Sequence, residues 1–421
     1  MDAVSESYDV AIVGGGLVGA TLALLLAEKG HSIALIEAGA FDSEVPETAN
    51  DQDGHFDPRV VALTQASEIL FKNLGIWASV AQNRVCPYQT MAVWDGDGTG
   101  EIVFHAHEAN ADHLGVIVEN SLLLAHLRQA LMKSGTVKLL SNTKVSQLGP
   151  MAEHQGQGVR FLGLNDGRVI ATKVLVAADG ALSAVRSMAS FAMREWSYNH
   201  QAIVTTVRTE QPHQFTARQV FMKEGPLAYL PLQTHQGDDH YCSIVWSQEP
   251  ERAEALMALS DQAFCEEIGK ALEYRLGHVT QVDQRFSIPL RQRHAKQYTK
   301  ERIALIGDAA HTIHPLAGQG VNLGLLDAAV LAEELLRSLD AGLDPGSDRT
   351  LKRYQRRRMG HNLSMMAVME SFKQLFAESA PPVRFFRNAG MSLLNQHPLL
   401  KRSILTRAMG LEGDLPAMAK A

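Results

Sequence analysis

The chain has 421 residues, of which 46% are apolar and 20% are charged, a composition typical of a folded globular protein without extended disorder. The formal net charge is −7, from 39 Lys and Arg against 46 Asp and Glu, which argues against a nucleic-acid-binding protein. Three cysteines without a CxxC spacing predict free thiols in a reducing compartment. Because the acidic start lacks a secretory signal and the longest apolar run is too short to span a bilayer, we expect a cytoplasmic protein without a transmembrane segment.

The first clear pattern predicts a strand, a glycine turn and a helix. Residues 8–13 form an apolar run of the buried parallel-strand type. Gly14, Gly16 and Gly19 follow as GxGxxG and lead into a predicted helix over 17–29. In this arrangement the glycines permit the turn, the approach of a pyrophosphate and close packing of the helix, whose positive end faces the pyrophosphate. The pattern therefore predicts a dinucleotide site.

Glu37 ends the next predicted strand, residues 32–37. An acid at this point accepts hydrogen bonds from an adenosine ribose and prefers a ribose without a phosphate, which favours FAD or NAD over NADP. Residues 40–57 contain six acids and no Lys or Arg, and they predict a solvated loop. Arg59 follows this loop, where it could contact the cofactor or form a surface ion pair.

Two later apolar strands each end in an aspartate. The stretch "KVLVAADGALSAVR" places Asp179 after the first strand, and "RIALIGDAA" places Asp308 after the second. Asp179 with Gly180 also has the pattern of a common turn, whereas a short acid at a strand end, such as Asp308, can bind sugar-like hydroxyl groups. Gly318 and Gly320 then precede a predicted helix, whose N–H groups and dipole suit an electron-rich acceptor such as the pyrimidine edge of a flavin.

His311 and His314 lie in the same glycine-rich stretch and leave several roles open. They have no further ligand at metal spacing, and the chain has no HExxH motif, which argues against a metal site. The absence of GxSxG argues against a hydrolase triad. We expect the histidines to shape the loop beneath a flavin, with proton transfer as the alternative.

Between these segments, short alternating or apolar runs predict an inserted antiparallel sheet. They include "TMAVWD", "QAIVTTVRT", "LAYLPL" and "YCSIVWS". Four aromatic residues in these runs are candidates either for a substrate pocket or for the ordinary core: Trp94, Phe221, Tyr229 and Trp246.

The three cofactor segments together resemble the FAD fingerprints of single-component flavin aromatic hydroxylases of the para-hydroxybenzoate hydroxylase type. More narrowly, "RVVALTQAS", "VENSLLLAHL", "CSIVWS" and "GDAAHTIHPLAGQGVNLG" are similar to the ubiquinone-biosynthesis hydroxylase family. Within it, "VENS" and "CSIVWS" resemble the 2-polyprenylphenol hydroxylase subgroup, which acts on ring position five. The resemblance covers residues 8–411, although the acidic insertion is longer than we expect for the family.

The resemblance implies an α/β fold in which a Rossmann-like FAD-binding domain contains an inserted antiparallel sheet and is followed by a helical segment. The implied domains are an FAD-binding domain (1–85, 116–190 and 296–345), a substrate domain (86–115 and 191–295) and a C-terminal helical region (346–421). It also implies roles for individual residues: Asp308 on the ribitol, Glu37 on the ribose, Arg128 near the pyrophosphate, and Gly318, Gly320 and Asn322 beside the flavin ring.

The activity implied by the resemblance is hydroxylation of a polyprenylated phenol in ubiquinone biosynthesis, with O2 activated as a flavin 4a-hydroperoxide. The electron donor would be NAD(P)H bound transiently, since the sequence has no second GxGxxG, or a separate protein. The sequence assigns no catalytic base. Three alternatives stay open: an FAD hydroxylase acting on a non-quinone substrate, a prenyl-chain reductase of the same fold, and a non-enzymatic escort that binds prenyl groups. Other ubiquinone-biosynthesis proteins and a second copy of the chain are candidate partners.

The C-terminal region differs from the rest of the chain in charge. Residues 351–410 contain eleven Lys or Arg and two Glu, beside Met, Phe and Leu at helical spacing. One interpretation is a pair of helices that pack on the FAD domain and expose a basic face. The other is a basic amphipathic surface that rests on anionic lipid and lets a prenyl tail enter from the bilayer.

Overall fold

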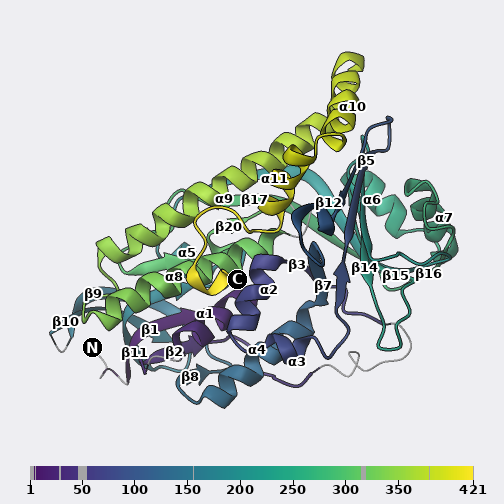
Figure 1. Ribbon diagram of the computed structural model, residues 1–421. Helices are drawn as coiled ribbons and strands as arrows, with labels where there is room; N and C mark the ends of the chain where they lie inside the picture. The colour runs from purple at the N-terminus through teal and green to yellow at the C-terminus, as the bar shows by residue number, and fades with distance from the viewer. Residues whose placement is uncertain are drawn as a thin grey trace.

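The computed structural model describes residues 4, 6–27, 30–45, 55–154, 156–313, 319–378 and 380–420. Two large sheets stand at opposite sides of the molecule, with a small sheet between them (Figure 1). None of the helices in the described ranges is both long and apolar enough to cross a bilayer.

The first large sheet is built on a parallel core in the order β19–β11–β1–β2–β8. Its central strands are apolar on both faces, and Val10, Ala11 and Ile12 are completely buried, as expected for a parallel sheet covered on both sides. The eight strands are β1 (Glu6–Val13), β2 (Ile33–Ile36), β8 (Val137–Leu140), β9 (Val145–His154), β10 (Gln157–Leu164), β11 (Val169–Ala177), β18 (Thr299–Lys300) and β19 (Ile303–Leu305).

Helix α1 (Leu17–Ala27) follows the glycine motif and is buried on nearly every side, because α4 and α8 pack against it. This surrounding explains its apolar sequence, which has no polar stripe. The other helices on this side of the molecule are α2 (Gln65–Asn73), α3 (Trp77–Val80), α4 (Asn120–Ser134), α5 (Ala184–Met188), α8 (Gln319–Asp340) and the long α9 (Asp348–Ala377).

The second large sheet has the order β20–β17–β12–β15–β14–β13–β5–β6 and is antiparallel except at the parallel pair β13–β5. Helices α6 (Pro250–Met257) and α7 (Asp261–Ala271) cover one of its faces, where they form a core with alternate residues of the central strands. Its strands are β5 (Thr90–Asp95), β6 (Glu101–His105), β12 (Met193–Thr209), β13 (Thr216–Phe221), β14 (Leu227–Leu232), β15 (Tyr241–Gln248), β16 (Val279–Val282), β17 (Phe286–Ala295) and β20 (His311–Thr312).

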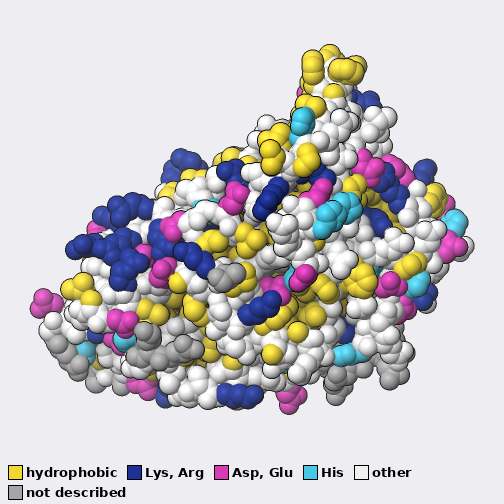
Figure 2. Space-filling view, in the orientation of Figure 1, with side chains coloured by type: hydrophobic (Ala, Val, Ile, Leu, Met, Phe, Trp, Pro, Cys, Tyr) yellow, Lys and Arg dark blue, Asp and Glu magenta, His cyan; other side chains and the backbone are white. Residues whose placement is uncertain are grey.

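A three-stranded sheet of β3 (Val60–Thr64), β4 (Cys86–Tyr88) and β7 (Gly115–Glu119) contacts the opposite face of the second sheet through Leu232 and Cys86. Helix α9 runs from the first sheet towards the second, and α10 (Pro381–Asn395) projects beyond its end (Figure 1). Helix α11 (Pro398–Ala408) follows. Figure 2 shows Lys and Arg gathered over the first half of α9, and hydrophobic side chains at the tip of α10.

Candidate cofactor and substrate site

The carboxyl ends of four neighbouring parallel strands gather the predicted cofactor residues. In the first sheet, β19, β11, β1 and β2 lie side by side and are parallel. They lead respectively to Asp308, Asp179, Gly14 and Glu37. Because such ends open on one edge of an α/β sheet, residues that are nearly three hundred positions apart share one site.

The three glycines of the first motif have different surroundings. Gly14 has φ +105°, and a Cβ at this residue would lie 2.4 Å from the oxygen of Ala178, which leads to the second motif. A Cβ on Gly19 would lie 1.9 Å from the Gly14 oxygen, so α1 can start this close to β1 only with glycine. Gly16 has no atom within 4 Å of the Cβ position. The loop is therefore closed by packing at two glycines and open at the third, which fits the approach of a phosphate group.

Glu37 and Arg128 both contact this loop. The Glu37 carboxylate accepts hydrogen bonds from Gly15 N at 2.6 Å and from Gly39 N at 2.9 Å. Arg128, on α4, donates to Gly15 O at 3.4 Å and to Asp42 O at 2.9 Å. Its Nε is buried and has no hydrogen-bond partner in the described part of the chain. A buried guanidinium nitrogen without an acceptor, beside a glycine loop, fits an anionic ligand.

Asp179 and Asp308 present carboxyl groups at the neighbouring strand ends. Asp179 Oδ2 accepts a hydrogen bond from Val185 N at 3.2 Å, whereas its buried Oδ1 has no partner among the described residues. The side chain of Asp308 is exposed, yet desolvation by the surrounding protein raises the pKa of its carboxyl, against the opposing effect of His311. A carboxyl group that is accessible and has a raised pKa suits a ligand with several hydroxyl groups.

Two buried arginines connect the second motif to the third. Arg186 donates to Ala181 O at 2.8 Å and to Ala309 O at 3.0 Å, and Arg293 donates to Ala181 O at 2.8 Å. Burial and the nearby Arg293 charge lower the pKa of Arg186. The sequence reasoning assigned no role to either arginine, because their partners are backbone carbonyls, two of which lie more than a hundred residues away in the chain.

Hydrogen bonds of Asn322 hold the start of α8 against β3 of the small sheet and against α2. Asn322 is 2% exposed, and its side-chain oxygen accepts hydrogen bonds from Thr64 N at 2.9 Å and from Ser67 Oγ at 2.7 Å. Gly320 lies in the first turn of α8 and is partly exposed. These contacts fix the position of the helix start, while contact of either residue with a flavin stays a prediction.

Three predicted residues have less structural context. Gly318 and His314 belong to 314–318 and lie outside the described residues. Arg59 has an exposed side chain, and its backbone oxygen accepts a hydrogen bond from Asn120 N, at the start of α4, at 2.9 Å. Arg59 therefore lies beside the helix that carries Arg128, and its contact with a cofactor stays a prediction.

Beneath the third motif, Asp327 of α8 is completely buried and takes part in four contacts. Its Oδ1 accepts from Arg358 Nε at 2.7 Å and from Asn362 Nδ2 at 3.1 Å, while its Oδ2 lies 2.6 Å from His311 Nε2 and accepts from Gly307 N at 3.1 Å. Burial opposes ionisation, but His311 and Arg358 outweigh it and hold the pKa of Asp327 well below its usual range. One ionised carboxylate thus joins α8, α9 and the GDAAH segment.

This network continues through Tyr298, whose hydroxyl lies 3.2 Å from Asn362 Nδ2 and 3.0 Å from His294 Nε2. Burial, and then the charge of His311, lower the pKa of His294 to about 4. For His311 these contacts favour the structural role that we expected from the sequence. The sequence reasoning missed Asp327, although a lone acid within the apolar run "LGLLDAAVL" indicates a buried, paired carboxylate.

The four candidate aromatic residues all lie in the core: Trp94, Phe221, Tyr229 and Trp246 are 2%, 7%, 0% and 3% exposed. Trp246 packs edge-on against Phe264 of α7, with ring centroids 6.2 Å apart. Phe221 stacks on Phe376 of α9 at 4.2 Å. Burial favours the ordinary core for these residues; strand alternation by itself predicts two faces without saying which of them meets the helices.

The opposite face of the second sheet carries a different row of residues. Gln219, Ala228, Val245, Val204 and Phe286 are paired across five adjacent strands. They share a face with Leu230 and Leu232, which contact the small sheet. Ala228, Val245, Val204 and Phe286 are only partly buried although their strands lie inside the sheet. An apolar wall is therefore left partly uncovered on the side of the small sheet.

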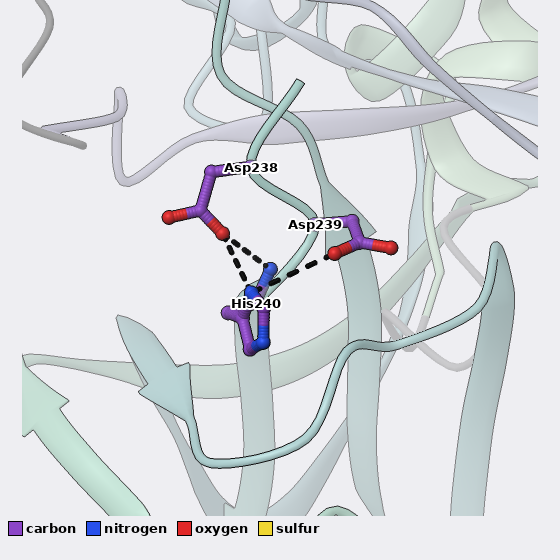
Figure 3. Close-up of side chains that lie close together, drawn as sticks. All are labelled: Asp238, Asp239 and His240. Carbon is purple, nitrogen blue, oxygen red and sulfur yellow. Dashed lines mark hydrogen bonds and ion pairs between the residues drawn. The ribbon is translucent and has the colours of Figure 1, made fainter. Parts of the chain in front are cut away.

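Asp238, Asp239 and His240 form a group that could in principle hold a metal ion (Figure 3). His240 Nδ1 lies 2.7 Å from Asp238 Oδ1 and 3.6 Å from Asp239 Oδ1, and Arg208 binds the other oxygen of Asp238 at 3.2 Å. Burial acts to raise the pKa of Asp238, but hydrogen bonds from His240 and Arg208 lower it. These contacts account for the cluster, and we assign no metal to it.

Comparison with known proteins agrees with this geometry. Residues 7–369 match the family model described as an FAD binding domain. The chain is 38% identical over 407 residues to the 3-demethoxyubiquinol 3-hydroxylase of Escherichia coli. The aligned region covers 97% of this chain and 100% of that protein. It is 35% identical to the ubiquinone hydroxylase UbiL of Rhodospirillum rubrum (96% and 89% covered) and 32% identical to the human mitochondrial ubiquinone biosynthesis monooxygenase COQ6 (95% and 92% covered).

Solved structures show the same fold at lower identity. The p-nitrophenol 4-monooxygenase PnpA of Pseudomonas putida superposes with a TM-score of 0.75 at 20% identity, covering 97% of this chain and 99% of that one. PqsL of Pseudomonas aeruginosa gives a TM-score of 0.71 at 23% identity, covering 92% and 99%. At these identities the two structures support the architecture alone.

Proposed function

Since the chain belongs to the FAD-dependent monooxygenases of ubiquinone biosynthesis, we propose that it hydroxylates the aromatic ring of a polyprenylated quinone precursor. The predictions of the family, of FAD and of monooxygenase activity are confirmed by these matches. In the overall reaction one oxygen atom of O2 enters a ring C–H bond, and the other leaves as water with two electrons and two protons from a reductant.

We infer that the strand-end residues hold FAD. Arg128 would contact the pyrophosphate beside the open Gly16, and Glu37 would bind the ribose in place of its present backbone partners. Asp308 would bind the ribitol, and the N–H groups at the start of α8 would meet the flavin ring. When bound, the reduced flavin supplies the electrons that activate O2, and NAD(P)H or a separate donor protein would reduce it.

The partly uncovered row on the second sheet supports a site for an apolar aromatic substrate. Val204, Ala228 and Val245 offer small apolar side chains, with the buried amide of Gln219 (4% exposed) at one end of the row. We propose that the ring lies against this row and that the prenyl chain follows the apolar wall. Exclusion of water by these residues would protect the reactive oxygen until it is transferred.

For the individual step, we propose hydroxylation of a 3-demethoxyubiquinol-type ring, because the E. coli relative with that activity matches along its whole length. The alternative is hydroxylation at ring position five, which the segments "VENS" and "CSIVWS" favour. The two steps act on different precursors and therefore leave different compounds when the enzyme is lost.

Complementation separates the two steps. Expression of this chain in a strain that lacks the 3-demethoxyubiquinol 3-hydroxylase should restore ubiquinone, as measured by mass spectrometry, with one labelled oxygen atom per turnover under 18O2. Rescue only of a strain deficient at ring position five would transfer the assignment to that step. A product whose prenyl chain is reduced and which contains no label would instead identify a reductase.

The substrate wall is tested separately with Val245→Trp. We expect this variant to keep FAD and normal thermal stability but to lose at least about tenfold in kcat/KM, because the larger ring fills the space in front of the wall. Leu343→Trp, at a residue that is 62% exposed outside both sheets, is the control and should keep full activity. Full activity of Val245→Trp would exclude this face as the substrate wall.

A further inference from the structure

Helices α10 and α11 expose an unusual set of apolar side chains, which we name the α10–α11 face. It consists of Phe385 (69% exposed), Phe386 (73%), Leu393 (58%), Leu399 (84%), Leu400 (57%) and Ile404 (40%). These two helices of 15 and 11 residues hold six of the sixteen exposed large apolar side chains in the described part of the chain. A surface helix ordinarily turns such residues inward, so this face is suited to a contact outside the molecule.

The inner side of α10 is fixed by polar contacts, so the apolar side cannot turn inward. Arg387 is buried and donates to Asp95 at 2.9 Å. Asn388 accepts from a backbone N–H in the turn before β6 at 2.5 Å, and Asn395 accepts from a backbone N–H of β6 at 3.3 Å. Because β6 is the edge strand of the second sheet, these contacts satisfy groups that would otherwise lie free.

The charges of this segment are less exposed than the basic face expected from the sequence. Residues 381–410 contain five Lys or Arg and no acid, but Arg387 and Lys401 are buried, with Lys401 2.5 Å from Glu108. Arg384 is partly buried and donates a hydrogen bond to Asp97 O. Arg402 and Arg407 are exposed, and Arg407 also contacts Glu412 at 3.3 Å. The outer surface is therefore mainly apolar with cations at its α11 end, a composition that suits lipid with anionic headgroups.

We propose that the α10–α11 face inserts shallowly into a membrane surface that contains anionic lipid, and that the enzyme takes its prenylated substrate from this bilayer. The substrate part of this proposal rests on the proposed function. Helix α10 projects from the body, with hydrophobic side chains at its tip (Figures 1 and 2). A projecting apolar ridge can enter a bilayer directly, whereas a protein partner would need a matching groove.

Vesicle flotation of the full chain tests this proposal. The vesicles are phosphatidylcholine alone, or phosphatidylcholine with about a third phosphatidylglycerol. The test variant is Phe385→Ser/Phe386→Ser/Leu393→Ser, and the matched control is Met132→Ser/Leu343→Ser, at residues that are 55% and 62% exposed elsewhere. We expect the wild type and the control to float with anionic vesicles, and the partition coefficient of the triple variant to fall at least about tenfold.

A truncation of α10 and α11 is unsuitable, because it would remove Arg387 and leave the buried carboxylate of Asp95 without its partner. Equal flotation of the triple variant and the wild type, or no flotation of either, would overturn the proposal. Gel filtration that shows a wild-type dimer lost in the triple variant, without a change in flotation, would assign the face to self-association instead. Flotation together with an inactive enzyme would contradict only the proposed function.

Discussion

Replacement of Asp327 by asparagine is the most direct test of how the third motif is held in place. The side chain keeps its size but loses its charge, so the guanidinium of Arg358, which is 2% exposed, is left without its counter-ion. The NH2 group of the new amide replaces one of the two carboxylate oxygens, and both oxygens now accept hydrogen bonds. In either orientation the NH2 group faces other donors, either Gly307 N and His311 or Arg358 and Asn362. Removing one partner of a buried pair typically costs about 3–5 kcal/mol.

That loss is a large part of the free energy of unfolding of a folded domain, which is roughly 5–15 kcal/mol. At about 2–4 °C per kcal/mol for domains of 150–250 residues, it corresponds to a fall in Tm of roughly 6–20 °C. The control is Asp348→Asn, which breaks the exposed pair with Lys352 (side chains 79% and 64% exposed) and should cost at most about 1 kcal/mol.

Two measurements are made: thermal unfolding, and the flavin absorbance that remains with the protein after gel filtration. Flavin content is measured because Gly307 and His311 belong to the same motif as Asp308, the proposed ligand of the ribitol. We expect Asp327→Asn to melt earlier and to lose FAD, and the double variant Asp327→Asn/Arg358→Met to regain part of the stability through removal of the unpaired charge. Unfolding of Asp327→Asn within about 1 °C of the wild type, with full flavin content, would refute the reasoning.

Three further predictions use other parts of the site. Gly19→Ala should destabilise the apoprotein, because the added Cβ would meet Gly14 O. Gly16→Ala should leave the stability of the apoprotein unchanged and weaken FAD binding. Equal melting temperatures of the two apoproteins would contradict this prediction. Arg128→Ala should weaken FAD binding at least about tenfold, by roughly 1.4 kcal/mol or more, measured by flavin fluorescence titration. His294 has a folded pKa of about 4 against an ordinary 6.5, so between these pH values the unfolded chain binds the additional proton and stability falls as pH falls. The loss should approach about 3 kcal/mol near pH 4, and in His294→Gln, compared by urea denaturation, the pH dependence should be weaker by that amount.

The cofactor half of the molecule could be predicted from the sequence because its determinants are local. Glycine is required at residues 14 and 19 by contacts within a single strand–turn–helix unit. Apolar runs ending in Glu37, Asp179 and Asp308 predict buried parallel strands, whose ends share one edge in this class of fold. The predicted helix over 17–29 is observed as Leu17–Ala27, with residues 28 and 29 outside the described ranges.

Tertiary structure decided what the local pattern left ambiguous. Alternation along β14 and β15 gives each strand two faces, and only the packing of α6 and α7 assigned Tyr229 and Trp246 to the core and Val245 to the open side. Likewise, composition showed the C-terminal charges, but only their partners, such as Asp327 for Arg358 and Asp95 for Arg387, decided which cations are buried. The local sequence does not show whether a charged or apolar side chain faces the core or the solvent, because burial depends on residues that folding brings from elsewhere in the chain.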